Sequence, residues 1–237
     1  MFKRIQAQKS YVYIMEQIVE LVENGRLKPG DQLPSESTLT KNFGASRPTV
    51  RQALTALEVL GIVRSQGGKG SYIQDHLDFD SLRYKSRKLE RSISPAELLE
   101  SRKMLETEIA QLAAVKANPT DIAMIYKSLS NFKDLVNGDT RKIDYDRLFQ
   151  LDREFHLLVA KATHNAALVQ MMQYIIRGLR DPMWLNLKGK SLAIPGRFEK
   201  YLSEHSEILR AIKNRNEKKA REGMYKHIRG IEKDFFD

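Results

Sequence analysis

Apolar residues in the first sixty positions recur at helical spacing between short polar turns. A stripe over residues 11–22 predicts an amphipathic helix, and the glycine three residues later suits a left-handed stop. Ser35 and Ser46 are placed to cap two further helices, which Gly44 and Gly61 end. The pattern therefore predicts three helices in succession, of which the middle one is short.

Two short runs of strand-forming residues follow, at 62–65 and 71–73. The glycine-rich segment 66–70 between them can adopt the positive φ angles of a hairpin turn. Three helices followed by a hairpin predict a winged helix-turn-helix with a two-stranded wing, over residues 1–74.

The pattern changes after a polar, charged stretch at 75–93, which we interpret as a linker. Ser94-Pro95-Ala96-Glu97 forms a capping box ahead of a long helical pattern that runs to about Ala117. Further helical patterns start at Asn118 and cover roughly 143–163, 166–180, 198–214 and 217–235. The predicted second domain, residues 94–237, is an all-α antiparallel helical bundle, so the chain as a whole is mainly α.

Composition excludes several function classes. The 237 residues carry a formal charge of +10, which suits a polyanionic partner, although much of the positive excess lies after residue 80. The lack of Cys excludes disulfides, thiolate metal sites and a Cys nucleophile. There is no uninterrupted run of about 18 apolar residues and no apolar leader, so we expect a cytoplasmic protein without a membrane segment.

The third predicted helix has the chemistry of a DNA-recognition helix. Such a helix needs forked donors and hydroxyl groups in its first turns, and this one offers Ser46, Arg47, Thr49 and Arg51. The two arginines are four residues apart and share a face opposite the apolar stripe. Taken alone, they could equally be solvated surface residues. At the hairpin tip, Lys69 adds a charge suited to a non-specific phosphate contact.

The segment from Leu33 to Ile73 closely resembles the GntR family of bacterial transcription regulators. The resemblance rests on Leu33-Pro34-Ser35-Glu36, Phe43-Gly44-Ala45-Ser46-Arg47-Pro48-Thr49-Val50-Arg51, Ala53-Leu54, Leu57, Gly61 and Gly68-Lys69-Gly70-Ser71-Tyr72-Ile73. It implies double-stranded DNA as the partner, with contacts at Ser37, Ser46, Arg47, Thr49, Arg51 and Gly68. Pro48 replaces a more usual Thr, so no hydroxyl contact is expected there. The resemblance also implies a two-fold dimer on a palindromic operator.

The second domain places metal-binding side chains on apolar helix faces. Asp152 and His156 are four residues apart and share one face, while His205 and His227 lie in the apolar stripes of two other predicted helices. Three imidazoles and a carboxylate suit a divalent first-row metal, with zinc first and nickel, manganese or iron as alternatives. Taken singly, each histidine could instead be an ordinary core residue.

Residues 94–232 resemble the FCD-type effector domain of the FadR subfamily within the same family. The resemblance rests on Glu97, Arg102, Glu106, Ala113-Ala114, Asp152, Phe155-His156, Asn165, His205, Ile208-Leu209, Ala211-Ile212, Ala220 and His227. The metal quartet of that subfamily matches Asp152, His156, His205 and His227. Members with the quartet intact typically bind small carboxylates on the metal, which implies an organic acid or sugar acid as the effector.

Three further residues are candidates for binding that effector. Arg102 lies on an apolar face, where an inward guanidinium needs an anion, either an effector carboxylate or Glu106 four residues on. Asn165 could contact the effector or act only as a helix N-cap. Arg197 precedes the helix that carries His205 and is a weaker candidate.

The sequence thus predicts a sequence-specific transcription regulator. We interpret it as a repressor that an effector releases from its operator, and the opposite direction, in which the effector promotes DNA binding, stays open. One alternative keeps the DNA-binding domain but makes the metal purely structural. The other is a metal-dependent enzyme, for which we find no unused carboxylate to serve as general base.

Overall fold

The computed structural model describes residues 10–66, 68–75, 77, 93–136 and 144–236. The chain divides into two compact units, residues 1–95 with 236–237, and residues 96–235. The predicted linker, 75–93, lies almost entirely outside the described residues. Among the described residues, no helix is both long enough and apolar enough to cross a membrane.

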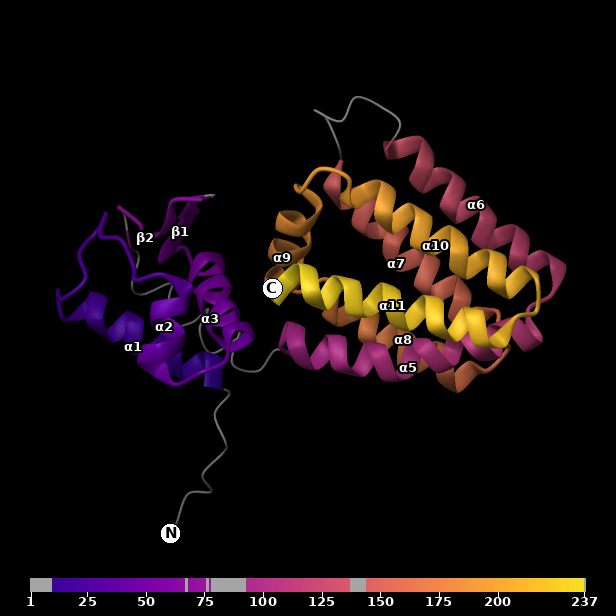
Figure 1. The fold of residues 1–237 in the computed structure, drawn as a ribbon, viewed down its shortest axis with the longest axis horizontal. Coiled ribbons are helices and arrows are strands. Elements are labelled where there is room, and N and C mark those ends of the chain that lie inside the picture. Colours follow the sequence, from indigo (N-terminus) through magenta and orange to yellow (C-terminus); the bar gives the residue numbers. More distant parts are fainter. Residues whose placement is uncertain (1–9, 67, 76, 78–92, 137–143, 237) are drawn as a thin grey trace, which may run out of the picture. The chain divides into compact units, whose positions relative to one another are not determined.

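The first unit consists of three helices and a hairpin, as predicted (Figure 1). Its elements are α1 (Ser10–Glu23), α2 (Glu36–Phe43), α3 (Arg47–Val59), β1 (Val63–Gln66) and β2 (Gly70–Ile73). Both α1 and α2 pack against α3. The predicted caps are present, because Ser35 Oγ accepts from Thr38 N at 3.2 Å and Ser46 Oγ accepts from Thr49 N at 3.3 Å.

The predicted two-stranded hairpin is present, and the connector before α2 adds an isolated bridge to it. Strands β1 and β2 pair antiparallel, with Val63 opposite Ile73, and the connector before α2 pairs with the other edge of β2. Leu33 N donates to Ser71 O at 2.8 Å there. Gly70 has a φ of +105°, and a Cβ at this position would lie 2.9 Å from Gln32 Nε2. The positive φ favours glycine where the wing meets the connector, and any larger residue would also displace the end of the Gln32 side chain.

The second unit is the predicted helical bundle (Figure 1). Its helices are α5 (Pro95–Lys116), α6 (Pro119–Val136), α7 (Tyr145–Lys161), α8 (Ala166–Gly178), α9 (Pro182–Leu192), α10 (Arg197–Lys213) and α11 (Glu217–Phe236). Helix α6 packs against α7 and α10, and α7 packs against α8.

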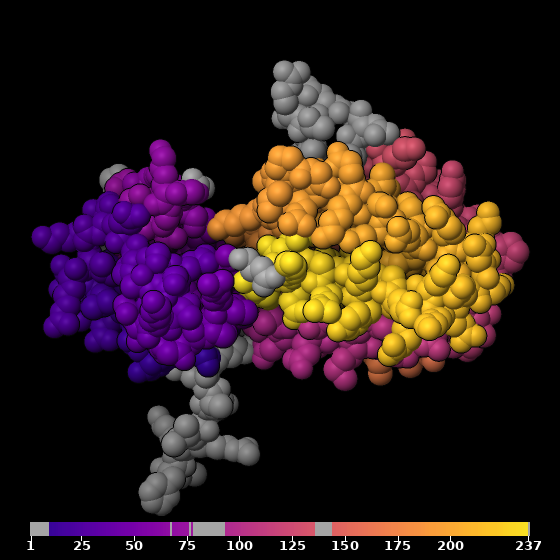
Figure 2. All heavy atoms as spheres, in the orientation of Figure 1, coloured from indigo at the N-terminus to yellow at the C-terminus, as the bar shows by residue number. Residues whose placement is uncertain are grey.

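Side-chain pairs fix the direction of α11 relative to α5. Lys103 near the start of α5 pairs with Glu232 near the end of α11 at 2.7 Å. Farther along α5, Gln111 Nε2 donates to Glu217, at the start of α11, at 3.4 Å. The two helices therefore run antiparallel, and Figure 2 shows α10 and α11 forming a continuous surface on one face of the unit.

Helix α9 was not predicted. The helical patterns predicted from the sequence leave a gap between residues 180 and 198, because Asp181-Pro182 and Pro195-Gly196 are typical of loops. In the structure, Asp181 Oδ1 accepts from Met183 N at 2.9 Å and caps α9, with Pro182 in the first turn. Proline is well tolerated in a first turn because its missing N–H would have no intrahelical partner there.

Candidate functional site

Three helices of the second unit bring the four predicted metal ligands together. Asp152 and His156 come from α7, His205 from α10 and His227 from α11. One ligand atom of each lies within 4.8 Å of the others, and no group offers more than 4% of its surface to solvent. We call these four residues the metal cluster.

The spacing of the metal cluster suits a divalent ion. His205 Nε2 lies 3.1 Å from His227 Nε2 and 3.9 Å from Asp152 Oδ1. Two nitrogen ligands of one tetrahedral zinc, each at about 2.05 Å, are about 3.3 Å apart. The donor set of three imidazoles and one carboxylate also suits zinc or another first-row metal. The residues therefore fit the metal that the sequence predicts.

Two glutamates contact imidazoles of the metal cluster, Glu204 through a hydrogen bond and Glu106 through an ion pair. Glu204 Oε2 lies 2.8 Å from His227 Nδ1, and Glu106 Oε2 lies 2.5 Å from His156 Nδ1. A carboxylate on one imidazole nitrogen fixes the tautomer and makes the other nitrogen a better metal ligand. The sequence interpretation did not assign this role to either glutamate. The only indication for Glu204 was its position directly before His205.

The electrostatic environment keeps Asp152, His205 and His227 in the protonation state that metal binding requires. Burial lowers the pKa of His205 and His227 well below 6.5, and neighbouring positive groups add to the effect. Burial would raise the pKa of Asp152, but Lys188 and the nearby histidines outweigh it and lower that pKa. At neutral pH the two imidazoles are therefore neutral and the carboxylate is ionised, as metal coordination requires.

Replacing Glu204 by Ala should weaken zinc binding about 10- to 100-fold, because His227 loses the partner that orients it. Competition with a fluorescent zinc indicator measures this affinity. Glu207→Ala is the matched control, since Glu207 is an exposed glutamate on the same helix. Equal zinc affinities in the two variants would show that the Glu204 contact does not support the metal.

Arg102 lies at the metal cluster and is fully buried. Its Nε donates to Glu106 Oε1 at 2.5 Å, and one of its terminal nitrogens lies 3.3 Å from His156 Nε2. The ion pair that the sequence allowed is therefore present. Within the described part of the chain, Arg102 Nη1 has no hydrogen-bond partner. The same side chain thus retains a donor for an anion.

The other two effector candidates are engaged elsewhere. Asn165 Oδ1 accepts from Ala167 N at 3.0 Å and from Leu168 N at 3.3 Å, which makes this residue the N-cap of α8. Arg197 pairs with Asp234 at 2.6 Å. The Tyr201 hydroxyl donates to the same aspartate at 3.1 Å. The structure therefore brings only Arg102 of the three candidates into contact with the metal cluster.

The predicted DNA-contact residues gather on α2, α3 and the wing. Ser37, Ser46, Arg47, Gly68 and Lys69 are exposed, while Thr49 and Arg51 are half-buried.

Some of the predicted DNA-contact side chains form hydrogen bonds within the first unit. Ser46 and Thr49 share a hydroxyl hydrogen bond of 2.8 Å, and Arg51 Nε donates to Glu36 Oε2 at 2.9 Å. Glu36 at the start of α2 is thus linked to Arg51 in α3. Of the two arginines in α3, Arg47 is exposed and Arg51 is half-buried.

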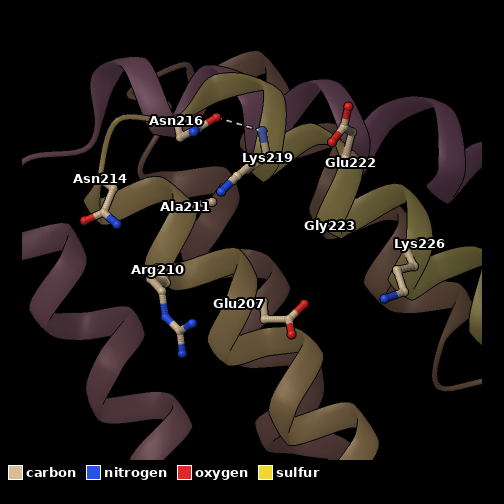
Figure 3. Close-up of a pocket in the computed structure, with 9 residues that line it drawn as sticks. All are labelled: Glu207, Arg210, Ala211, Asn214, Asn216, Lys219, Glu222, Gly223 and Lys226. Atoms are coloured by element: carbon tan, nitrogen blue, oxygen red, sulfur yellow. Dashed lines mark hydrogen bonds between the residues drawn. The ribbon is translucent and has the colours of Figure 1, made fainter.

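A separate surface pocket lies where the end of α10 meets the start of α11 (Figure 3). Its volume is about 420 Å³, and it is lined by Glu207, Arg210, Ala211, Asn214, Asn216, Lys219, Glu222, Gly223 and Lys226. None of the predicted site residues lines it. The Asn216 side chain is occupied there as a cap, because its Oδ1 accepts from Lys219 N at 3.0 Å.

Comparisons with known proteins cover both units. The family model for bacterial regulatory proteins of the gntR family matches residues 10–73, and that for FCD domains matches residues 97–230. The regulator LutR of Bacillus subtilis is 31% identical over 220 residues, which cover 90% of this chain and 94% of LutR. The Uxu operon regulator of Haemophilus influenzae is 28% identical over 235 residues, which cover 97% of this chain and 83% of that protein.

Among solved structures, a GntR protein of Streptococcus agalactiae matches with a TM-score of 0.48 and 23% identity, covering 94% of this chain and 99% of that one.

The curated relatives are named as regulators of transcription, which goes against the alternative of a metal-dependent enzyme. The chain therefore belongs to the GntR family of bacterial transcription regulators, with an FCD domain following its DNA-binding domain.

Proposed function

We propose that this regulator is a cytoplasmic repressor whose affinity for its operator is lowered by a small carboxylate effector bound at the metal cluster. The observation that carries the proposal is the buried group of Asp152, His156, His205 and His227, with the free donor of Arg102 beside it. A metal ion there, zinc in the first place, supplies a Lewis acid that can bind a carboxylate oxygen. Nickel, manganese or iron also suits these ligands.

The DNA contacts are assigned to the exposed start of α3 and to the wing. Arg47 and Arg51 are the groups suited to guanine edges or phosphates, and the side chains of Ser37, Ser46 and Thr49 offer hydroxyls. The backbone of Gly68 and the ammonium group of Lys69 lie at the wing tip and suit the DNA backbone. We assign a homodimer, because two copies of α3 would read the half-sites of a palindromic operator.

The switch requires that the effector bind the two states of the dimer unequally. A carboxylate held by the metal and Arg102 would change the packing of the bundle and so the spacing of the two recognition helices. A coupling of about 5- to 150-fold in operator affinity is ordinary for such a switch. Asn165 and Arg197 stay candidate effector contacts only if their present partners are exchanged on binding.

The test uses zinc-loaded, full-length protein and a duplex selected by the protein from a random library. Fluorescence anisotropy measures duplex affinity with and without members of a panel of organic and sugar acids. We expect a palindromic selected sequence and at least one acid that weakens binding about fivefold or more.

The structural-metal alternative makes a different prediction. If zinc raises thermal stability but no acid in the panel changes duplex affinity, the metal only holds three helices together and the proposal fails. An acid that strengthens DNA binding would keep the sensor but reject the release mechanism.

A further inference from the structure

Helix α9 carries a buried lysine beside the metal cluster. Lys188 is 2% exposed, and its Nζ has no hydrogen-bond partner among the described residues. The Nζ lies 3.7 Å from Asp152 Oδ1 and 4.1 Å from the centroid of the Tyr201 ring. Burying an ammonium group is costly, and one carboxylate that also serves a metal compensates it poorly.

A second buried cation lies on the same side of α9. The Arg102 guanidinium sits 5.3 Å from the ring centroid of Trp184, which is one helical turn before Lys188. Arg102 Nη1 and Lys188 Nζ are thus two buried donors that have no hydrogen-bond partner among the described residues.

A charge count shows what the site requires once a metal is bound. The buried positive groups, Arg102 and Lys188, balance the buried negative groups, Glu106 and Asp152, and a divalent ion then adds two positive charges. The remaining acids nearby, Glu204 and Asp234, have cations of their own. Arg197 lies 2.6 Å from Asp234, and Lys200 lies between the two acids, 3.8 Å from Asp234 and 4.0 Å from Glu204, so two cations balance these two acids. A ligand with two negative charges would neutralise the buried excess.

We propose that Lys188 is a second anchor for the effector, so that the site selects small dianionic acids over monocarboxylates. One carboxylate is held by the metal and Arg102 Nη1, as in the proposed function, while Lys188 Nζ binds the second negative group. This inference rests on the proposed function for the metal-bound carboxylate and adds its charge class.

The test compares malonate with acetate on zinc-loaded, full-length protein by isothermal titration calorimetry at matched ionic strength. We expect malonate to bind at least about tenfold more tightly than acetate, since only malonate fills both anchors. In Lys188→Met, malonate affinity should fall about tenfold or more, while acetate affinity changes less than about threefold. The zinc content should stay unchanged.

Lys190→Met is the control, because Lys190 is an exposed lysine on the same helix. Malonate binding no tighter than acetate binding in the wild-type protein would overturn the inference, even if Lys188→Met fails to fold. Unchanged malonate affinity in a zinc-loaded Lys188→Met protein would also overturn it and leave Lys188 only as a counter-charge for Asp152. If malonate binds through Lys188 but operator affinity does not change, the repressor proposal fails and the anchor stands.

Discussion

Replacing His205 by Ala is expected to reduce bound zinc from about one ion per chain to less than a tenth of that at micromolar concentrations. Loss of a residue that only hydrogen-bonds a metal ligand lowers metal affinity roughly 10- to 100-fold. Loss of one of the four metal ligands themselves should lower it further. His205 is fully buried, and its Nε2 lies within 3.9 Å of two other members of the metal cluster. Elemental analysis of purified protein measures the loss.

The same change should remove the stabilisation that zinc provides. At free zinc of 100 times its Kd, binding adds about 2.7 kcal/mol to the free energy of unfolding. For a unit of this size, that corresponds to a rise of about 5–10 °C in Tm. Wild-type protein stripped with a chelator and then reloaded should show this rise, and His205→Ala should not.

His164→Ala is the matched control for this experiment. His164 has a side-chain exposure of 48% and bonds Asp121 at 2.8 Å, away from the metal cluster. Its replacement should leave both the zinc content and the zinc-dependent rise in Tm unchanged. A His205→Ala protein that keeps its zinc and its rise in Tm would refute the assignment of the metal cluster.

The elements with strong local signals could be predicted from the sequence. Ser35 and Ser46 each begin a helix by accepting from a backbone N–H three residues on, and such caps depend only on nearby residues. The Asp152–His156 pair follows in the same way, because residues four apart share a helix face. Local chemistry was sufficient for these features.

Local sequence features alone could not predict that the four residues of the metal cluster come together. Nothing in the spacing of His205 and His227 requires their Nε2 atoms to lie 3.1 Å apart, because α10 and α11 meet through tertiary packing. The resemblance to the FCD domain supplied that pairing. Residues that hydrogen-bond the metal ligands, such as Glu204, could not be predicted from the sequence. Several acidic residues lie near His205 along the chain, and only the tertiary packing determines which of them contacts His227.

Helix α9 was missed for two physical reasons. Its 11 residues are bounded by Asp181-Pro182 and Pro195-Gly196, which are typical of loops. Its buried face also includes Lys188, which interrupts the apolar periodicity between Trp184 and Leu192. A charged residue on an otherwise apolar stripe breaks the pattern that predicts a helix. Such departures from the expected pattern are typical of functional sites, as we propose for Lys188.

Replacing Arg47 by Ala should weaken binding to the selected duplex about 100-fold or more. A side chain that reads a base edge contributes about 1–3 kcal/mol of discrimination, and a two-fold dimer contains two copies. Arg47 is exposed at the start of α3, whereas Arg51 already gives its Nε to Glu36. Fluorescence anisotropy at fixed salt, with random duplex as the competitor, measures the loss.

The comparison with Lys69→Ala separates base reading from phosphate binding. Lys69 is exposed at the wing tip, so its loss should weaken selected and random duplexes alike and reduce the salt dependence by about one counterion per contact. Arg47→Ala should instead reduce the ratio between the two affinities. Arg26→Ala, at an exposed arginine of the same unit outside the predicted contact residues, should do neither. If Arg47→Ala weakens both duplexes equally, Arg47 contacts only the backbone, and sequence reading must then depend on Arg51 and the hydroxyl groups beside it.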